Sequence, residues 1–96
     1  MKTVKQLKKI LAQHKPDLKR KYHVKQLGVF GSYARGEEMQ TSDLDILVDF
    51  EQPIGLDFVT LAEELETLLG VKVDLVSANA VKPRMMESIK RELVYV

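Results

Sequence analysis

The sequence of 96 residues contains no cysteine and no tryptophan, and only 6% of its residues are aromatic. The absence of cysteine excludes disulfide bonds and thiolate metal sites, and it is compatible with a reducing cytosol. No apolar stretch approaches the roughly 20 residues that a membrane-spanning helix needs, and the lysine-rich start lacks the apolar core of a signal peptide. We therefore expect a cytoplasmic protein without a membrane segment.

The length and composition of the chain limit the number of domains and the size of the core. With 45% hydrophobic and 30% charged residues, residues 1–96 are enough for one domain with one modest core and leave no room for a second. The net charge of +1 hides an asymmetry: residues 1–25 hold nine basic residues and one acidic residue, whereas residues 26–96 hold six basic and thirteen acidic residues. The basic segment is typical of a solvated helix face, and attraction of nucleic acid or of an acidic partner is the alternative.

Hydrophobic periodicity predicts helices that alternate with strands. Apolar residues at helical spacing predict a helix from about Leu56 to Leu69, which Gly70 is well placed to end. This order of elements implies a small α/β sandwich, although periodicity alone leaves the strand directions open. The other expected elements are a first helix carrying Val4, Leu7, Ile10 and Leu11, strands at 24–30, 43–50 and 71–76, a short helix at 33–36, and a last helix that opens at Pro83.

A tight turn follows the first predicted strand. Val29 and Phe30 end an apolar run, and Gly31 permits a sharp turn with positive φ. Ser32 can then offer both its hydroxyl and its backbone N–H to a phosphate. A short helix from Tyr33 onward would direct its positive end toward the same place. The sequence thus predicts a phosphate-sized site at this turn.

Carboxylates follow the turn on one face of the next predicted strand. Because side chains alternate along a strand, Asp43 and Asp45 share a face with Leu47, and the intervening apolar residues face the other side. Two adjacent carboxylates repel each other, and a hard cation such as Mg²⁺ removes that cost by taking carboxylate and phosphate oxygens as ligands. Asp74, the one acid in another β-branched run, would complete the set if the two strands are neighbours. Without the preceding turn, Asp43 and Asp45 are better explained as a turn residue and an exposed strand residue, and an exposed strand position is the alternative for Asp74.

The combined pattern of GSYARG at 31–36, SDLD at 42–45 and VDLV at 73–76 resembles the minimal nucleotidyltransferase branch of the DNA polymerase beta-type nucleotidyltransferase superfamily. The resemblance covers nearly the whole chain, and the closing KPRMMESIKRELVYV is similar to the last helix of that branch. It implies a small α/β fold in which about four helices flank a three-stranded mixed sheet.

The same resemblance implies a role for each motif residue. Gly31 and Ser32 would hold the triphosphate of ATP, and Arg35 would either contact a phosphate or support the turn. The two aspartates of SDLD, Asp43 and Asp45, would bind two Mg²⁺ ions. Asp74 would help to bind a metal and would activate the acceptor hydroxyl.

The resemblance also implies an activity and a partner. We expect transfer of AMP from ATP to a protein hydroxyl, a tyrosine of a helical HEPN-type ribonuclease toxin, with this chain as the antitoxin. Larger transferases carry an acceptor domain that this sequence lacks, so another protein would bring the acceptor. The alternatives are a non-catalytic antitoxin that acts by occlusion and a nucleic-acid-binding protein that uses residues 2–25. Three intact aspartates favour the enzyme, because a pure binder has no physical reason to keep them.

Overall fold

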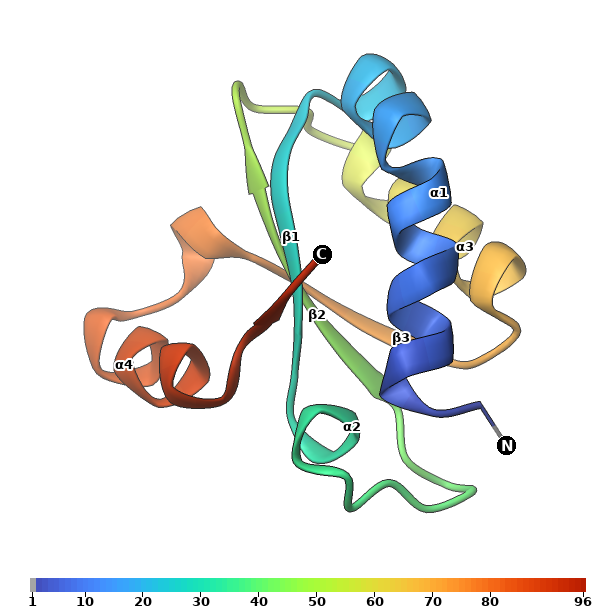
Figure 1. Ribbon diagram of the computed structural model, residues 1–96. Coiled ribbons are helices and arrows are strands. Elements are labelled where there is room, and N and C mark those ends of the chain that lie inside the picture. Colours follow the sequence, from blue (N-terminus) through green and yellow to red (C-terminus); the bar gives the residue numbers. More distant parts are fainter. Residues whose placement is uncertain (1) are drawn as a thin grey trace.

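The elements of the structure, a computed structural model that describes residues 2–96, follow the hydrophobic pattern of the sequence. The four strands form one sheet in the order β3-β2-β1-β4, in which β1 is antiparallel to both β2 and β4, and β2 is parallel to β3 (Figure 1). The elements in chain order are α1 (Val4–Tyr22), β1 (Val24–Phe30), α2 (Ser32–Arg35), β2 (Leu44–Phe50), α3 (Asp57–Leu69), β3 (Val73–Ser77), the 3-10 helix η1 (Ala78–Ala80), α4 (Pro83–Glu92) and β4 (Val94–Tyr95).

The alternation along β2 divides the sheet into a core face and an open face. Leu44, Ile46 and Val48 are fully buried on the face that α1 and α3 cover side by side, and α4 lies on the opposite face (Figure 1). Asp45, between two of these residues, is only half-buried. The predicted alternation is therefore confirmed, although Leu47, on the same face as Asp45, is also buried. The helices contribute Leu7, Leu11, Leu18, Leu61, Leu65 and Leu69 to the same core.

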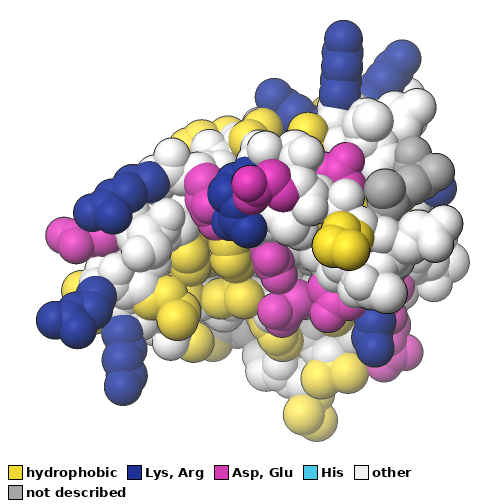
Figure 2. Space-filling view, turned by 90° about the horizontal axis from the view of Figure 1, so that it is seen from below, with side chains coloured by type: hydrophobic (Ala, Val, Ile, Leu, Met, Phe, Trp, Pro, Cys, Tyr) yellow, Lys and Arg dark blue, Asp and Glu magenta, His cyan; other side chains and the backbone are white. Residues whose placement is uncertain are grey.

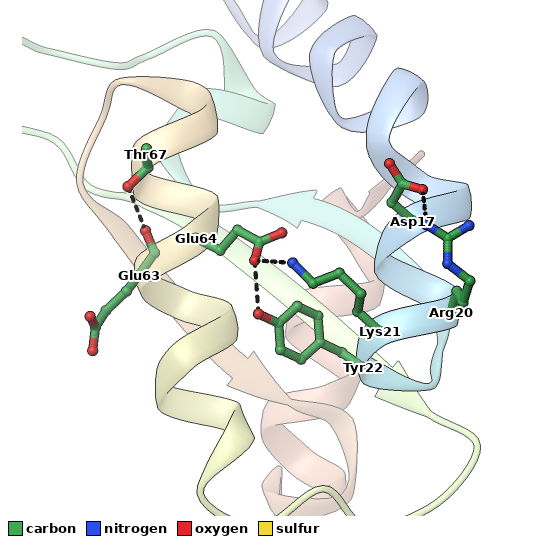
Figure 3. A network of polar contacts seen from close by, with 7 residues as sticks. All are labelled: Asp17, Arg20, Lys21, Tyr22, Glu63, Glu64 and Thr67. Atoms are coloured by element: carbon green, nitrogen blue, oxygen red, sulfur yellow. Dashed lines mark hydrogen bonds and ion pairs between the residues drawn. The ribbon is translucent and has the colours of Figure 1, made fainter.

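A polar contact joins the basic helix α1 to the acidic helix α3. Glu64 Oε1 accepts hydrogen bonds from Lys21 Nζ and from the Tyr22 hydroxyl, both at 2.8 Å (Figure 3). The hydrogen bond from Lys21 lowers the pKa of Glu64, while burial and the bond to Glu64 raise the pKa of Tyr22. Part of the charge asymmetry of the sequence is thus a match between two neighbouring helices.

None of the described helices is long and apolar enough to cross a bilayer.

The expected count of three strands is wrong, because the last helix is shorter than predicted. α4 ends at Glu92, and Val94 pairs with Val29 on the free edge of β1, which makes a fourth strand. Leu93 has an extended backbone, and its side chain lies where a β-carbon at Gly28 would be only 2.6 Å from its Cδ1. The absence of a side chain at Gly28 therefore gives Leu93 the space to turn the chain from helix into strand.

Candidate functional site

The turn between β1 and α2 lies directly against the carboxylate of Asp45. Gly31 has φ 76° and ψ −154°, a backbone conformation that residues with a β-carbon rarely adopt. A β-carbon at Gly31 would collide with Oδ2 of Asp45 and would lie 2.9 Å from its Cγ. Both the backbone angle and the close approach therefore require glycine here, and they bring the predicted phosphate turn onto the acidic strand.

The parallel pairing of β2 with β3 brings a second carboxylate to the same place. Asp45 is the direct register partner of Asp74, so the two side chains leave the same face of the sheet from strands about 5 Å apart. The start of β3 is fixed by Glu66 of α3, whose Oε2 accepts a hydrogen bond from Val73 N–H at 2.9 Å. The expectation that Asp74 lies opposite an aspartate of the neighbouring strand is confirmed for Asp45, but Asp43 lies outside the paired part of β2. Asp43 immediately precedes β2 and is exposed.

The electrostatics of Asp45 reflect this crowding. Burial, followed by the charge and a hydrogen bond of Asp74, raises the pKa of Asp45 from 3.8 to about 6, and Asp43 and Glu92 add to the effect. Seen from the end of the sheet that carries α2, acidic side chains gather beside a hollow lined by hydrophobic ones (Figure 2). This accumulation of negative charge favours a bound cation.

The donor set is suited to a hard divalent cation. Mg²⁺ is commonly held by one or two carboxylates together with water and substrate phosphates, and less often by a closed cage of protein ligands. Within residues 2–96, no three acidic or histidine side chains are gathered closely enough to form such a cage. Asp43, Asp45 and Asp74 offer only oxygen ligands at an open surface, which fits a metal that arrives with a phosphate ligand.

Asp43, alone of the three predicted aspartates, lines a cavity of about 970 Å³. Ser42 and Asp43 border it on one side, and Lys2 and Lys72 border it on others. Tyr33 also lines this cavity, yet only 2% of its surface is exposed, so its ring belongs to the core. Asp43 is thus accessible to a ligand, unlike the more enclosed Asp45.

Arg35 at the end of α2 is held by two carboxylates. Its Nε donates to Glu37 Oε1 at 2.6 Å, and its Nη1 donates to Glu92 Oε2 at 2.8 Å. These hydrogen bonds raise the pKa of Arg35, which remains charged at any pH at which the protein folds. A guanidinium has five N–H donors, so three remain for another acceptor after these two bonds. The structure therefore gives Arg35 a supporting contact with the turn and keeps donors for a ligand.

Sequence reasoning missed Glu92, which reaches the site from α4. Its Oε1 accepts a hydrogen bond from Gly31 N–H at 2.9 Å, and the bond from Arg35 is the main cause of its lowered pKa. One signal was available in the sequence. An acid in the last turn of a helix interacts unfavourably with the helix dipole, so Glu92 at the end of α4 calls for a specific partner elsewhere.

Known proteins are similar to this chain in sequence and, separately, in structure. The model of the nucleotidyltransferase domain family matches residues 5–96. The protein adenylyltransferase MntA of Thermococcus cleftensis is 47% identical over 97 residues, which are 100% of this chain and 98% of that protein. The solved structure of a protein provisionally named a minimal nucleotidyltransferase superposes with a TM-score of 0.75 at 41% identity, over 92% of this chain and 93% of that one.

One chain of a solved toxin-antitoxin complex also shares the fold. The complex contains the tri-AMPylated HEPN toxin of Shewanella oneidensis with an MNT antitoxin, and the match has a TM-score of 0.65 at 20% identity, over 92% of this chain and 70% of the matched chain. At this identity the similarity bears on the fold alone. Because the family match extends over nearly the whole sequence and a relative at 47% identity spans all of it, this chain belongs to the nucleotidyltransferase domain family and is a nucleotidyltransferase.

Proposed function

We propose that this chain is a metal-dependent protein adenylyltransferase that transfers AMP from ATP to a tyrosine hydroxyl of a HEPN-type ribonuclease toxin and so acts as its antitoxin. The observation that carries the proposal is the register pair of Asp45 and Asp74 beneath the turn at Gly31. The relative named protein adenylyltransferase supports the reaction, and the complex of a HEPN toxin with an MNT antitoxin supplies the class of partner.

The turn would hold the triphosphate. Ser32 is half-buried at the first position of α2, where its hydroxyl and backbone N–H are both suited to a phosphate oxygen. Arg35, three residues later, adds a positive charge and N–H donors in a planar arrangement that matches phosphate oxygens. These groups would fix the orientation of the nucleotide relative to the carboxylates, and orientation accounts for much of the catalysis of phosphoryl-group transfer.

Asp43 and Asp45 would hold two Mg²⁺ ions, with Asp74 as a further ligand. When bound, the metal neutralises the carboxylates and the phosphate oxygens and stabilises the negative charge that develops in the transition state. Asp74 would accept the proton of the acceptor hydroxyl, whose oxygen forms a bond to the α-phosphorus. The bond from the α-phosphorus to the bridging oxygen breaks, and pyrophosphate leaves with its electron pair.

The decisive experiment combines the wild-type chain with a purified HEPN partner, ATP and MgCl₂, followed by intact mass spectrometry. We expect the partner to gain mass in multiples of one AMP and to stay inactive as a ribonuclease after this chain is removed. The variant that carries both Asp43→Asn and Asp45→Asn should fold, because it relieves repulsion between like charges, but it should neither add mass nor protect. Protection by this variant without added mass would instead support the occluding antitoxin.

A second variant separates binding from chemistry. Asp74→Asn should leave ATP binding largely intact and slow the transfer of AMP by orders of magnitude, because it removes activation of the attacking hydroxyl more than binding of the ground state. Asp49→Asn, which changes an acid further along β2, is the matched control and should transfer AMP like the wild type. If Asp74→Asn transferred AMP at the wild-type rate, Asp74 would have no role in the reaction.

A further inference from the structure

Glu92 uses both oxygens of its carboxylate on the short segment that is proposed to hold the triphosphate. Oε1 accepts the N–H of Gly31, 61 positions earlier in the chain, at 2.9 Å. Oε2 accepts Nη1 of Arg35, 57 positions earlier, at 2.8 Å. One side chain from the far end of the sequence thus joins the first and last residues of segment 31–35.

Burial and charge strengthen the hydrogen bonds that Glu92 accepts from Gly31 and Arg35. Gly31 is buried, and a buried N–H that lacks an acceptor is strongly unfavourable, so the bond to Glu92 helps to hold the turn. The side chain of Glu92 is 27% exposed, and hydrogen bonds to a charged carboxylate are stronger than those between neutral groups. The turn and Arg35 are therefore held by the same carboxylate, that of Glu92.

Glu92 is itself held in place by the sheet. Directly after Glu92, Leu93 lies against Gly28, and β4 pairs with β1 next to the turn. Val96 N–H donates to the Leu27 carbonyl at 3.0 Å, which continues the pairing along β1. The backbone at Glu92 is therefore fixed on one side by α4 and on the other by the pairing of β4 with β1.

We propose that Glu92 is a positioning residue, which holds the turn at Gly31 and the guanidinium of Arg35 in the arrangement that receives the phosphates of the nucleotide. The inference rests on the proposed function. Arg35 keeps three N–H donors for a phosphate, and a guanidinium that is already oriented loses less conformational freedom when the nucleotide binds. The ligand would be the triphosphate of a nucleotide, bound through the turn, Arg35 and the Ser32 hydroxyl.

The opposite role for Glu92 makes an opposite prediction. A carboxylate on Gly31 N–H and Arg35 occupies donors that a phosphate can also use, and a competitor of this kind would have to leave before the nucleotide binds. Removal of a competitor tightens nucleotide binding, whereas removal of a positioning residue weakens it. The donors that Arg35 retains and the buried N–H of Gly31 favour the positioning role.

The test is isothermal titration of ATP with MgCl₂ into the wild type, Glu92→Ala and Glu92→Gln, alongside thermal unfolding without ligand. Loss of two hydrogen bonds to a charged group predicts that Glu92→Ala weakens ATP binding by about tenfold or more. Glu92→Gln keeps one acceptor for Gly31 N–H and should weaken binding less, and it serves as the second variant if Glu92→Ala unfolds. Glu87→Ala, an exposed acid on the same helix, should bind ATP like the wild type.

A double-mutant cycle separates positioning from a merely structural role. If Glu92 acts through Arg35, Glu92→Ala should weaken ATP binding clearly less in an Arg35→Ala background than in the wild type. Equal losses in both backgrounds, or ATP binding by Glu92→Ala as tight as or tighter than that of the wild type, would overturn the positioning role alone. Failure of the wild type to bind ATP would overturn the proposed function together with it.

Discussion

Asp45→Asn should stabilise the metal-free protein, because the folded state holds this carboxylate beside other negative charges. Burial and the neighbouring Asp74 raise the pKa of Asp45 from 3.8 to about 6, so ionisation of this group costs free energy in the folded state. At 1.36 kcal/mol per pH unit, this difference corresponds to at most about 3 kcal/mol. Asp45 is only partly buried, and solvent screening reduces the expected gain to about 1–2 kcal/mol. Asparagine is uncharged and can still donate a hydrogen bond to Asp74.

The pH dependence of this gain follows from its sign. The pKa of the carboxyl group is raised by folding, so between pH 3.8 and about 6 the folded wild type binds a proton that the unfolded chain does not. The stability of the wild type therefore falls as the pH rises through this window. The advantage of Asp45→Asn should be complete above about pH 7 and should disappear as the pH approaches 4.

Urea unfolding with EDTA at pH 8 and at pH 4.5 measures this advantage, and Asp49→Asn on the same strand is the matched control. Addition of MgCl₂ with ATP should reverse the order, since a ligand at about 100 times its dissociation constant stabilises the folded wild type by roughly 2.7 kcal/mol. An advantage of Asp45→Asn that is absent at pH 8, or that is equally large at both pH values, would refute the electrostatic account of this site.

Three further outcomes follow from the structure. Gly36→Ala should lower the free energy of unfolding by about 1–2 kcal/mol, because a β-carbon there has free space and only the positive φ is unfavourable. Gly31→Ala should lower it by at least about 1 kcal/mol more in chemical denaturation, because its β-carbon also collides with a carboxylate. Glu64→Ala leaves the buried Tyr22 hydroxyl without its acceptor and should lower the free energy of unfolding by about 1 kcal/mol, while Glu63→Ala, whose side chain points away in Figure 3, should not. Mg²⁺ with ATP should raise the melting temperature of the wild type but not of a variant that lacks both aspartates of SDLD, and an equal rise would place the nucleotide elsewhere.

Local patterns in the sequence predicted the parts of the fold that depend on local physics. Leu44, Ile46 and Val48 alternate with polar residues, and such a pattern buries one face of a strand in whatever sheet it joins. Gly70 ends α3 with φ 68° as expected, because a left-handed residue after the last turn favours glycine. The meeting of Asp45 and Asp74 was predictable only on the condition that their strands are neighbours, because each acid by itself does not specify the adjacent strand.

The missed features depend on contacts between distant residues. β4 consists of only Val94 and Tyr95, and two residues are too few for hydrophobic periodicity to distinguish a strand from the end of the preceding helix. Their pairing requires the free edge of β1, which the local sequence does not reveal. Glu92 was missed for the same reason, because its partners Gly31 and Arg35 become neighbours only after β4 has paired.

The late position of β4 in the sequence has a consequence for the order of folding. The strands β1 and β2 pair across the connection 31–43, whereas the bond from Gly31 to Glu92 closes a loop of 61 positions. Contacts of such long range form after local ones in the search for the native state. A molecule that has folded its core but not yet paired β4 would carry the acidic strand without the anchored turn. Nucleotide affinity would therefore report the completion of folding, and the rate at which ATP binding appears during refolding would follow the pairing of β4 with β1.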